Sequence, residues 1–287
     1  MLNQINFNKT KPPLTYYGGK QQLSKHILQL IPEHKLYSEV FLGGGAIYFA
    51  KEPTQSVIND TNNNLINFYR QIKQNHKELI KEIEATLYAQ EEHKLASRLY
   101  FDKISVEDMH FSPEVQVKRK KAWAVFVLAH QSYLSIFGNT WNVSFNKRTG
   151  SRQSINNNPQ KFDQKKINMI VNGYVERLQN TTIFNDDALK VLRKCDTLHT
   201  FHYIDPPYYN SNCGHYGGYT LKDFENLLKQ CSELQGKFML SSYPSEILSK
   251  YSKEFGWKTI ELDMHKSAGQ ATGKSDMRKV EVITMNY

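Results

Sequence analysis

The residues best suited to chemistry follow a short apolar run in the second half of the chain. Phe201 to Ile204 is rich in residues that favour strands, and Asp205-Pro206-Pro207-Tyr208 follows it at once. Proline has no backbone N–H and a fixed φ angle, so the two prolines end the strand and stiffen the backbone behind the carboxylate. We therefore expect a carboxylate, a carbonyl and an aromatic ring in one rigid corner at the carboxyl end of a strand, where open α/β sheets bind ligands.

This corner suits methylation of a planar amino group. The lone pair of an exocyclic base amine is delocalised into the ring, which makes the nitrogen a poor nucleophile. The Asp205 carboxylate and the Pro206 carbonyl could accept its two hydrogens, draw the nitrogen towards tetrahedral geometry and localise the lone pair. Tyr208 could stack on the base, because every base has a π-face. The alternative is a structural turn in which Asp205 caps a helix.

A second chemical feature is a glycine turn between a strand and a helix. Leu36–Leu42 reads as a buried strand, Gly43-Gly44-Gly45 follows, and a helix is expected over Ala46–Lys51. This order is typical of a site for a nucleotide-type cofactor, but the spacing is not G-x-G-x-x-G, so a dinucleotide is not expected. The next strand, from Val57, ends in Asp60, which could accept hydrogen bonds from ribose hydroxyls. Alternatively, Asp60 caps the helix expected from Asn62.

The N-terminal part carries Tyr16-Tyr17-Gly18-Gly19-Lys20 just before an amphipathic helix that Pro32 ends. The glycines allow a ligand to approach the backbone closely, and Lys20 could pair with a carboxylate or a phosphate. The spacing is not that of a phosphate-binding P-loop.

Composition and charge narrow the class of protein. The chain has 287 residues, 39% of them hydrophobic and 23% charged, which is typical of a globular protein. A net charge of +9 is compatible with a nucleic-acid partner. The three cysteines have no C-x-x-C spacing, so neither a disulfide framework nor a zinc site is expected. No signal peptide and no apolar run of about 18 residues is present, which favours the cytoplasm.

The middle of the chain reads as an insertion into the α/β pattern. Helical periodicity runs from Asn62 with a break near Gln74-Asn75, and Trp123–His130 is an apolar helix that anchors the insertion. The cations Lys118–Lys121 are expected on a solvated face. Asn156–Pro159 reads as a linker.

A segment from Phe137 to Arg152 has the composition of a hairpin that enters a DNA groove. Asparagine and arginine suit adenine and guanine edges, whereas lysine and hydroxyl groups suit phosphates. An ordinary polar surface loop is the alternative. The candidate DNA contacts are Asn139, Trp141, Asn142, Lys147, Arg148 and Arg152.

After the insertion the α/β pattern returns. Further strands are expected at 182–184, 238–240, 259–262 and 280–283, the last two as an antiparallel ribbon, and 210–219 could be a lid. The predicted fold is α/β, with a Rossmann-like sheet and an inserted, mainly helical domain. The predicted segments are 10–72 and 161–287 for the sheet domain and 73–160 for the insertion.

Six segments together resemble the Dam family of adenine-N6 DNA methyltransferases, the D12 class. In chain order they are TYYGGK, EVFLGGGAIYF, VINDTNNNLINFY, DPPYY, FMLSSY and EVITMNY. The resemblance covers about residues 12–72 and 180–287, and the middle is similar only through FGNTWNVSFN. It implies a seven-stranded sheet that binds S-adenosylmethionine as methyl donor.

The resemblance also implies roles for single residues. Those expected at the donor are Tyr16, Gly19, Lys20, Phe41, Gly43, Gly44, Gly45, Asp60 at the ribose, Asp187 at the adenine amino group, and Asp205. Asp205, Pro206, Pro207 and Tyr208 would form the catalytic element. Tyr16-Tyr17 departs from the family's usual Trp-Ala, and the loop reads F-L-G-G-G, which still satisfies F-x-G-x-G.

The resulting prediction is an enzyme that methylates N6 of adenine in a specific duplex DNA sequence. The target base must leave the stack to be reached. No metal is expected, because the sulfonium carries its own leaving group. Methylation of cytosine N4 or of RNA adenine is one alternative. Others are a non-catalytic DNA-binding protein on this fold and a cofactor-binding structural subunit of a larger restriction complex. GATC is the family's common target but is not carried over, and a monomer is expected.

Overall fold

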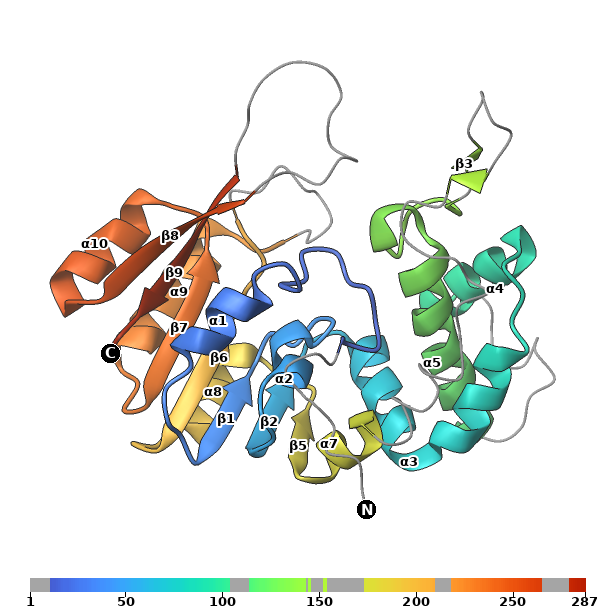
Figure 1. The fold of residues 1–287 in the computed structure, drawn as a ribbon, viewed down its shortest axis with the longest axis horizontal. Helices are drawn as coiled ribbons and strands as arrows, with labels where there is room; N and C mark the ends of the chain where they lie inside the picture. Colours follow the sequence, from blue (N-terminus) through green and yellow to red (C-terminus); the bar gives the residue numbers. More distant parts are fainter. Residues whose placement is uncertain are drawn as a thin grey trace. The chain divides into compact units, whose positions relative to one another are not determined.

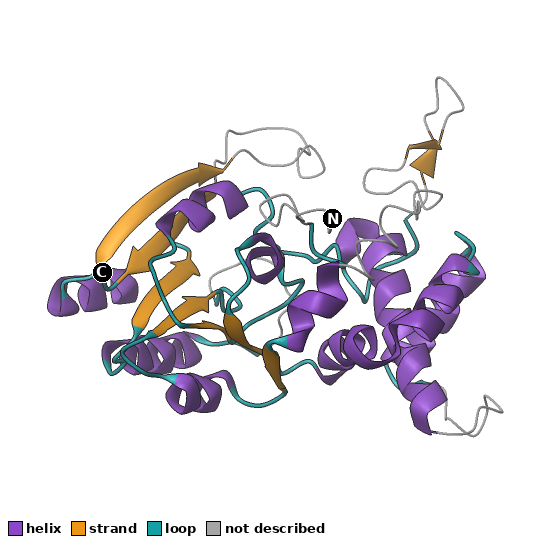
Figure 2. Ribbon diagram, turned by 60° about the horizontal axis from the view of Figure 1, so that its bottom comes forward, coloured by secondary structure: helices purple, strands orange, loops and turns teal. Residues whose placement is uncertain are grey.

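The computed structural model describes residues 11–103, 114–142, 144–145, 152–153, 173–209, 218–264 and 279–287 (Figure 1). The helices are α1 (Ser24–Leu30), α2 (Ala46–Ala50), α3 (Asn63–Glu84), α4 (Gln90–Tyr100), α5 (Glu114–Gln131), the 3-10 turn η3 (Tyr133–Ser135), α7 (Val175–Gln179), α8 (Ala188–Cys195), α9 (Leu221–Ser232) and α10 (Glu246–Phe255). The strands are β1 (Leu36–Glu39), β2 (Gln55–Asn59), β3 (Ser144–Phe145), β4 (Arg152–Gln153), β5 (Thr181–Phe184), β6 (Thr200–Ile204), β7 (Lys237–Ser242), β8 (Lys258–Met264) and β9 (Lys279–Met285). Figure 2 distinguishes these helices and strands by colour.

A seven-stranded sheet has the order β5-β2-β1-β6-β7-β9-β8. The pairs β1–β2, β1–β6 and β6–β7 are parallel, whereas β9 runs antiparallel to both β7 and β8. Every strand predicted for the sheet is present, and the predicted ribbon at the end of the chain is the β8–β9 pair. The mixed α/β class is therefore confirmed.

The chain divides into two compact units, residues 1–29, 43–53 and 60–185, and residues 30–42, 54–59 and 186–287. In the second unit β1, β6, β7, β9 and β8 lie side by side (Figure 1). β6 is buried along its whole length and β7 from Phe238 onwards. Burial on both faces explains why these strands read as nearly continuous apolar runs rather than as alternating ones.

The helices of the second unit begin with sequence-encoded caps. Thr220 and Asp223 form a reciprocal capping box at the start of α9, and the Ser245 side chain accepts a hydrogen bond from the Leu248 N–H at the start of α10. Each cap satisfies N–H groups that a helix cannot pair internally.

In the first unit α3, α4 and α5 pack together. Asn75 has φ −135° and ψ 32°, so α3 is kinked where the sequence predicts a break. The apolar stretch Ala122–Ala129 of α5 is buried, as its apolar sequence predicts. β3 and β4 form an antiparallel pair, the arrangement that the predicted hairpin requires.

In the cation run before this apolar stretch, Lys118 is exposed as expected for a solvated face, whereas the next three cations are not. Arg119 donates to Glu82 at 2.7 Å, Lys120 lies 3.6 Å from the same carboxylate, and Lys121 pairs with Asp102. The partly buried Glu82 side chain, only 16% exposed, attracts both cations from the neighbouring helix. These residues therefore hold the helices of the first unit together.

Four predicted features lie wholly or mainly outside the described residues. They are the linker at 156–159, the helix expected over 167–174, the lid expected over 210–219 and the ribbon loop at 267–278. Of these features the structure describes only residues 173–174 and 218–219.

Candidate functional site

The catalytic element predicted from the sequence lies in the second unit, directly after β6. β6 pairs in parallel with β1 on one side and β7 on the other, so the carboxyl ends of these strands share one edge of the sheet. Asp205 is half-buried there and Pro206 is buried. No helix starts within 205–209, so the alternative that Asp205 serves as a helix cap is not supported by the described residues.

Tyr208 is folded back towards the carboxylate. Its hydroxyl donates to Asp205 Oδ1 at 3.2 Å and lies 2.9 Å from Ser241 Oγ. Its ring meets Tyr243 edge-on, with centroids 4.4 Å apart and an angle of 68° between the planes. Hydrogen bonds therefore fix the Tyr208 hydroxyl, and the contact with Tyr243 fixes the orientation of its ring.

Further polar groups lie behind this corner. Burial, then the negative charges of Asp205 and Glu39, raise the pKa of the Tyr203 phenol, which is fully enclosed and stays neutral. On β1 the Tyr37 hydroxyl donates to Glu39 Oε2 at 2.5 Å. The corner thus has a buried acidic background that the apolar sequence pattern did not reveal.

The glycine turn lies in the first unit and is tied to Asp60. Gly43 and Gly45 have φ values of 50° and 68°, which L side chains rarely adopt. The Gly43 N–H donates to Asp60 Oδ2 at 2.9 Å, and its carbonyl accepts from the Tyr69 hydroxyl at 3.0 Å. The Asn62 N–H donates to Asp60 Oδ1 at 2.9 Å.

The Asp60 carboxylate thus fixes the glycine turn through the Gly43 N–H, and it does not cap α3. The side chain that caps α3 is Asn62, which accepts from the N–H groups of Asn64 and Leu65. Burial raises the pKa of Asp60, while the hydrogen bonds from Asn62 and Gly43 act in the opposite direction.

Tyr16 packs directly on the glycine turn. A Cβ on Gly44 would lie 2.7 Å from Tyr16 Cβ, and one on Gly43 would lie 3.3 Å from the Tyr16 ring. The Gly19 N–H donates to the Tyr16 carbonyl at 3.1 Å, and the buried Lys20 donates to the Gly18 carbonyl at 3.2 Å. The absence of side chains at the turn is therefore what allows these two segments to meet.

Phe41 and Asp187, which are also predicted to bind the methyl donor, belong to the second unit. The Phe41 ring lies edge-on to Tyr219 at 6.5 Å. Asp187 is exposed and caps α8, with Oδ1 accepting from the Lys190 N–H at 3.0 Å. Asn59, which the sequence reading did not single out, donates from one amide to the carbonyls of both Val40 and Asp186 at 3.0 Å.

The candidate DNA contacts are only partly described. Asn139 donates to the Tyr133 carbonyl at 3.1 Å. The Trp141 ring packs near Tyr88, and the buried Asn142 donates its N–H to the Gln131 carbonyl at 2.8 Å while its own carbonyl accepts from the Tyr88 hydroxyl. Arg152 pairs by its backbone with Phe145 in the two-stranded hairpin. Lys147 and Arg148 lie outside the described residues.

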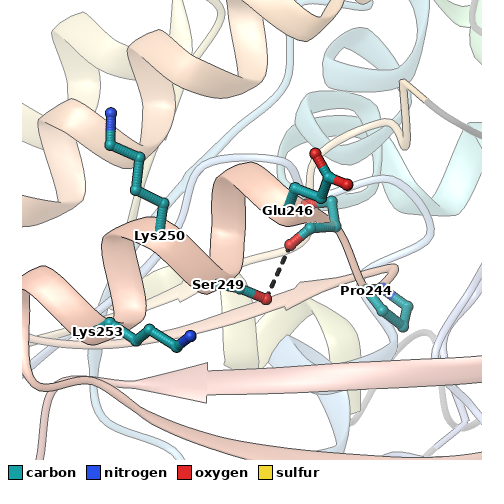
Figure 3. Close-up of a pocket in the computed structure, with 6 residues that line it drawn as sticks. Pro244, Glu246, Ser249, Lys250 and Lys253 are labelled. Carbon is teal, nitrogen blue, oxygen red and sulfur yellow. Dashed lines mark hydrogen bonds between the residues drawn. The ribbon is translucent and has the colours of Figure 1, made fainter.

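The described parts of the chain contain no group of three or more His, Cys, Asp or Glu side chains arranged to hold a metal ion. None of their helices is both long and apolar enough to cross a membrane. A surface hollow at the start of α10, lined by Pro244, Ser245, Glu246, Ser249, Lys250 and Lys253, contains none of the predicted site residues (Figure 3).

The chain is similar to known methyltransferases. A family model described as D12 class N6 adenine-specific DNA methyltransferase matches residues 16–265. The type II methyltransferase M1.LlaDCHI of Lactococcus lactis subsp. cremoris is 29% identical over an alignment of 298 residues, covering 99% of this chain and 97% of the relative. A DNA N-6-adenine-methyltransferase of Escherichia phage P1 is 34% identical over 95 residues, 32% of this chain and 13% of the phage protein.

Among solved structures, precorrin 8w decarboxylase of Methanobacterium thermoautotrophicum matches 97% of this chain and 96% of its own, with 10% identity and a TM-score of 0.40. A likeness this weak supports no functional argument. The seven-stranded mixed sheet is consistent with a Rossmann-like methyltransferase fold.

Proposed function

The chain belongs to the D12 class of N6 adenine-specific DNA methyltransferases, and from this premise we propose that it transfers a methyl group from S-adenosylmethionine to N6 of adenine in a specific duplex sequence. The observation that carries the proposal is the Asp205–Tyr208 corner at the carboxyl end of β6, between two parallel neighbours. Its carboxylate, carbonyl and aromatic ring are the groups that an adenine amine requires.

Asp205 and the Pro206 carbonyl accept the two amine hydrogens and localise the nitrogen lone pair. Tyr208 stacks on the base after it has left the duplex, because the amine cannot be reached inside the helix. The donor supplies a methyl group on a positively charged sulfur, which needs no metal to leave. The hydrogen bond from the Tyr208 hydroxyl to Asp205 Oδ1, 3.2 Å in this structure, supports joint action of the two side chains.

The residues proposed for the donor fit its chemistry. Gly43 is only half-buried and has no side chain, so a ligand can approach its backbone closely. Gly44 and Gly45, also assigned to the donor, are buried beside it. Asp60, fixed by two N–H groups, has lone pairs suited to ribose hydroxyls. The exposed carboxylate of Asp187 suits an adenine amino group. Tyr16, Gly19, Lys20 and Phe41 complete the proposed set, with Asp205.

Duplex DNA is the proposed partner. The net charge of +9 favours a polyanion, and the hairpin supplies asparagine, tryptophan and three cations. We assign DNA contacts to Asn139, Trp141, Asn142, Lys147, Arg148 and Arg152. The protein is proposed to act in the cytoplasm as a monomer, which light scattering after size-exclusion chromatography tests.

The decisive experiment compares the wild type with Asp205→Ala. We expect transfer of tritiated methyl groups to DNA to fall by roughly a hundredfold or more, while S-adenosylmethionine still binds in calorimetry. Asp186→Ala, which removes an exposed carboxylate elsewhere in the same unit, serves as control. Full activity of Asp205→Ala would refute the assigned role.

The modified base is identified by mass spectrometry of digested nucleic acid. N6-methyladenine in DNA supports the proposal, whereas N4-methylcytosine or methylated RNA would replace it with the corresponding activity. No binding of S-adenosylmethionine would favour a non-catalytic DNA-binding protein. Methylation-sensitive long-read sequencing of DNA from a host that expresses the chain gives the recognition sequence.

A further inference from the structure

A buried polar chain extends from the catalytic corner into the sheet of the second unit. Tyr208 Oη lies 3.2 Å from Asp205 Oδ1 and 2.9 Å from Ser241 Oγ, and Ser241 Oγ donates to Glu281 Oε2 at 3.5 Å. Ser241 is fully buried, and Glu281 is only 9% exposed. A carboxylate is rarely placed so deep unless polar groups stabilise it.

The sheet register explains how residues 40 positions apart meet. Ser241 on β7 is opposite Ile283 on β9, so Glu281 is its diagonal neighbour on the same face. Tyr243, two residues after Ser241, contacts the Tyr208 ring. The hydroxyl and the ring of the proposed catalytic tyrosine are therefore contacted by β7 and by the residue that directly follows it.

The number of hydrogens determines how many contacts of this buried polar chain can be hydrogen bonds. Three gaps separate Asp205, Tyr208, Ser241 and Glu281, whereas the two hydroxyls supply one hydrogen each. If both carboxylates are ionised, one gap has no hydrogen. One more proton on either carboxylate fills all the gaps in a single direction.

We propose that Ser241 and Glu281 are positioning residues for methyl transfer, which hold the Tyr208 hydroxyl against Asp205 and share the proton that Asp205 takes from the amine. The proposal rests on the adenine methyltransferase function above. It adds a destination for the proton that the reaction must remove.

The step balances as follows. The nitrogen lone pair forms the bond to the methyl carbon, and the electron pair of the carbon–sulfur bond stays on sulfur, which becomes a neutral thioether. The nitrogen, now positively charged, loses one proton to the Asp205 carboxylate. Asp205 passes this proton to Tyr208 as Tyr208 passes its own to Ser241 and Ser241 passes its own to Glu281, which restores the Asp205 carboxylate.

Other titratable groups face this chain. Tyr203 on β6 interacts electrostatically with both Asp205 and Tyr208, and Glu39 and Tyr37 on β1 interact with Tyr203. Tyr243 contacts Tyr208. None of the hydrogen bonds described for these side chains replaces the Ser241 link, so changes at Ser241 test the chain itself.

Ser241→Ala removes the central hydroxyl, and Ser242→Ala is the matched control. Ser242 is the next residue of β7 and is equally buried, but its Oγ has no hydrogen-bond partner among the described residues. On DNA that contains the recognition sequence of the wild type, we expect Ser241→Ala to lower the single-turnover rate of methyl transfer by roughly tenfold to a hundredfold. The affinity for S-adenosylmethionine and the thermal midpoint should match those of Ser242→Ala.

Glu281→Gln is an independent test, because glutamine still accepts from Ser241 but removes the negative charge. Without this anion the ionised form of Asp205 is favoured, so the acid limb of the pH–rate profile should move to lower pH while the maximal rate falls. A purely structural role would leave the limb in place.

The results separate this inference from the proposed function. If the wild type methylates adenine, but Ser241→Ala reacts at the rate of Ser242→Ala or Glu281→Gln leaves the acid limb unmoved, the inference is overturned and the function stands. If the wild type does not methylate adenine in DNA, the function itself fails. Loss of donor binding or of thermal stability in Ser241→Ala alone would make it a structural residue and overturn the inference.

Discussion

Replacing Gly44 with alanine places a methyl group where Tyr16 already packs. The new Cβ would lie 2.7 Å from Tyr16 Cβ and 3.3 Å from the Leu14 carbonyl oxygen. Ordinary contacts begin at 3.4 Å, so the Tyr16 segment must move by roughly 0.7 Å (3.4 − 2.7). A Cβ cannot rotate out of the way, so the backbone that carries it must shift.

The size of the effect follows from overpacking. An extra methyl group in a close-packed site typically costs about 1–3 kcal/mol. If Tyr16 contacts the methyl donor as proposed, a displacement of this size should weaken donor binding by about five- to 150-fold. The same strain should lower the free energy of unfolding by a similar amount.

Urea unfolding and calorimetry with S-adenosylmethionine measure both effects. Gly173→Ala is the control, because a Cβ there meets nothing within 4 Å. The shortest contact is with the Tyr16 Cβ atom and not its ring, so Gly44→Ala should still destabilise a Tyr16→Ala background and should destabilise a Tyr16→Gly background much less, with only the 3.3 Å contact to the Leu14 carbonyl oxygen remaining. Equal stability and donor affinity for Gly44→Ala and Gly173→Ala would refute the reasoning.

Three further predictions concern other parts of the chain. Burial raises the pKa of Asp60 above its ordinary value of 3.8, so the folded state binds the carboxyl proton more tightly than the unfolded state does. The free energy of unfolding therefore falls as the pH rises from 3.8 through the higher pKa of the folded state. The stability of the wild type relative to Asp60→Asn should therefore decline from pH 3.8 upwards in denaturant titrations, and a rising difference would contradict this. Thr220→Ala removes the cap of α9 and should cost about 1 kcal/mol in urea unfolding, whereas Thr220→Ser should retain most of it. Phe137→Ala removes the ring that meets Tyr16 edge-on at 5.6 Å, and should weaken the binding of S-adenosylmethionine by about two- to tenfold. Phe101→Ala, which removes an exposed ring, is the control. Equal affinities of the two variants in calorimetry would exclude a contribution of the Phe137 ring to donor binding.

The sequence alone was sufficient for the elements that depend on local patterns. The apolar runs before Asp205 and before Gly43 predict buried parallel strands, because both faces of such a sheet are covered. The break near Asn75 and the apolar core of α5 also follow from local periodicity. In each case the signal lies within a few residues of the feature that it predicts.

Other features were ambiguous because their partners are distant in sequence. Whether Asp60 would cap α3 or support the glycine turn could not be read from its position after a strand. The fold brings the Gly43 N–H, 17 residues away, to one carboxylate oxygen, while Asn62 takes over the cap. The cations at 119 and 120 likewise pair with Glu82 only because α3 and α5 pack together.

The sequence by itself determined the order in which the chemical groups occur along the chain, with a glycine turn first and a carboxylate, two prolines and a tyrosine last. Only the tertiary structure decided what lies behind that tyrosine. Ser241 and Glu281 meet because β9 runs antiparallel to β7 in one particular register. A shift of the register by one residue would turn Glu281 to the opposite face, and nothing in the local sequence of either strand specifies the pairing.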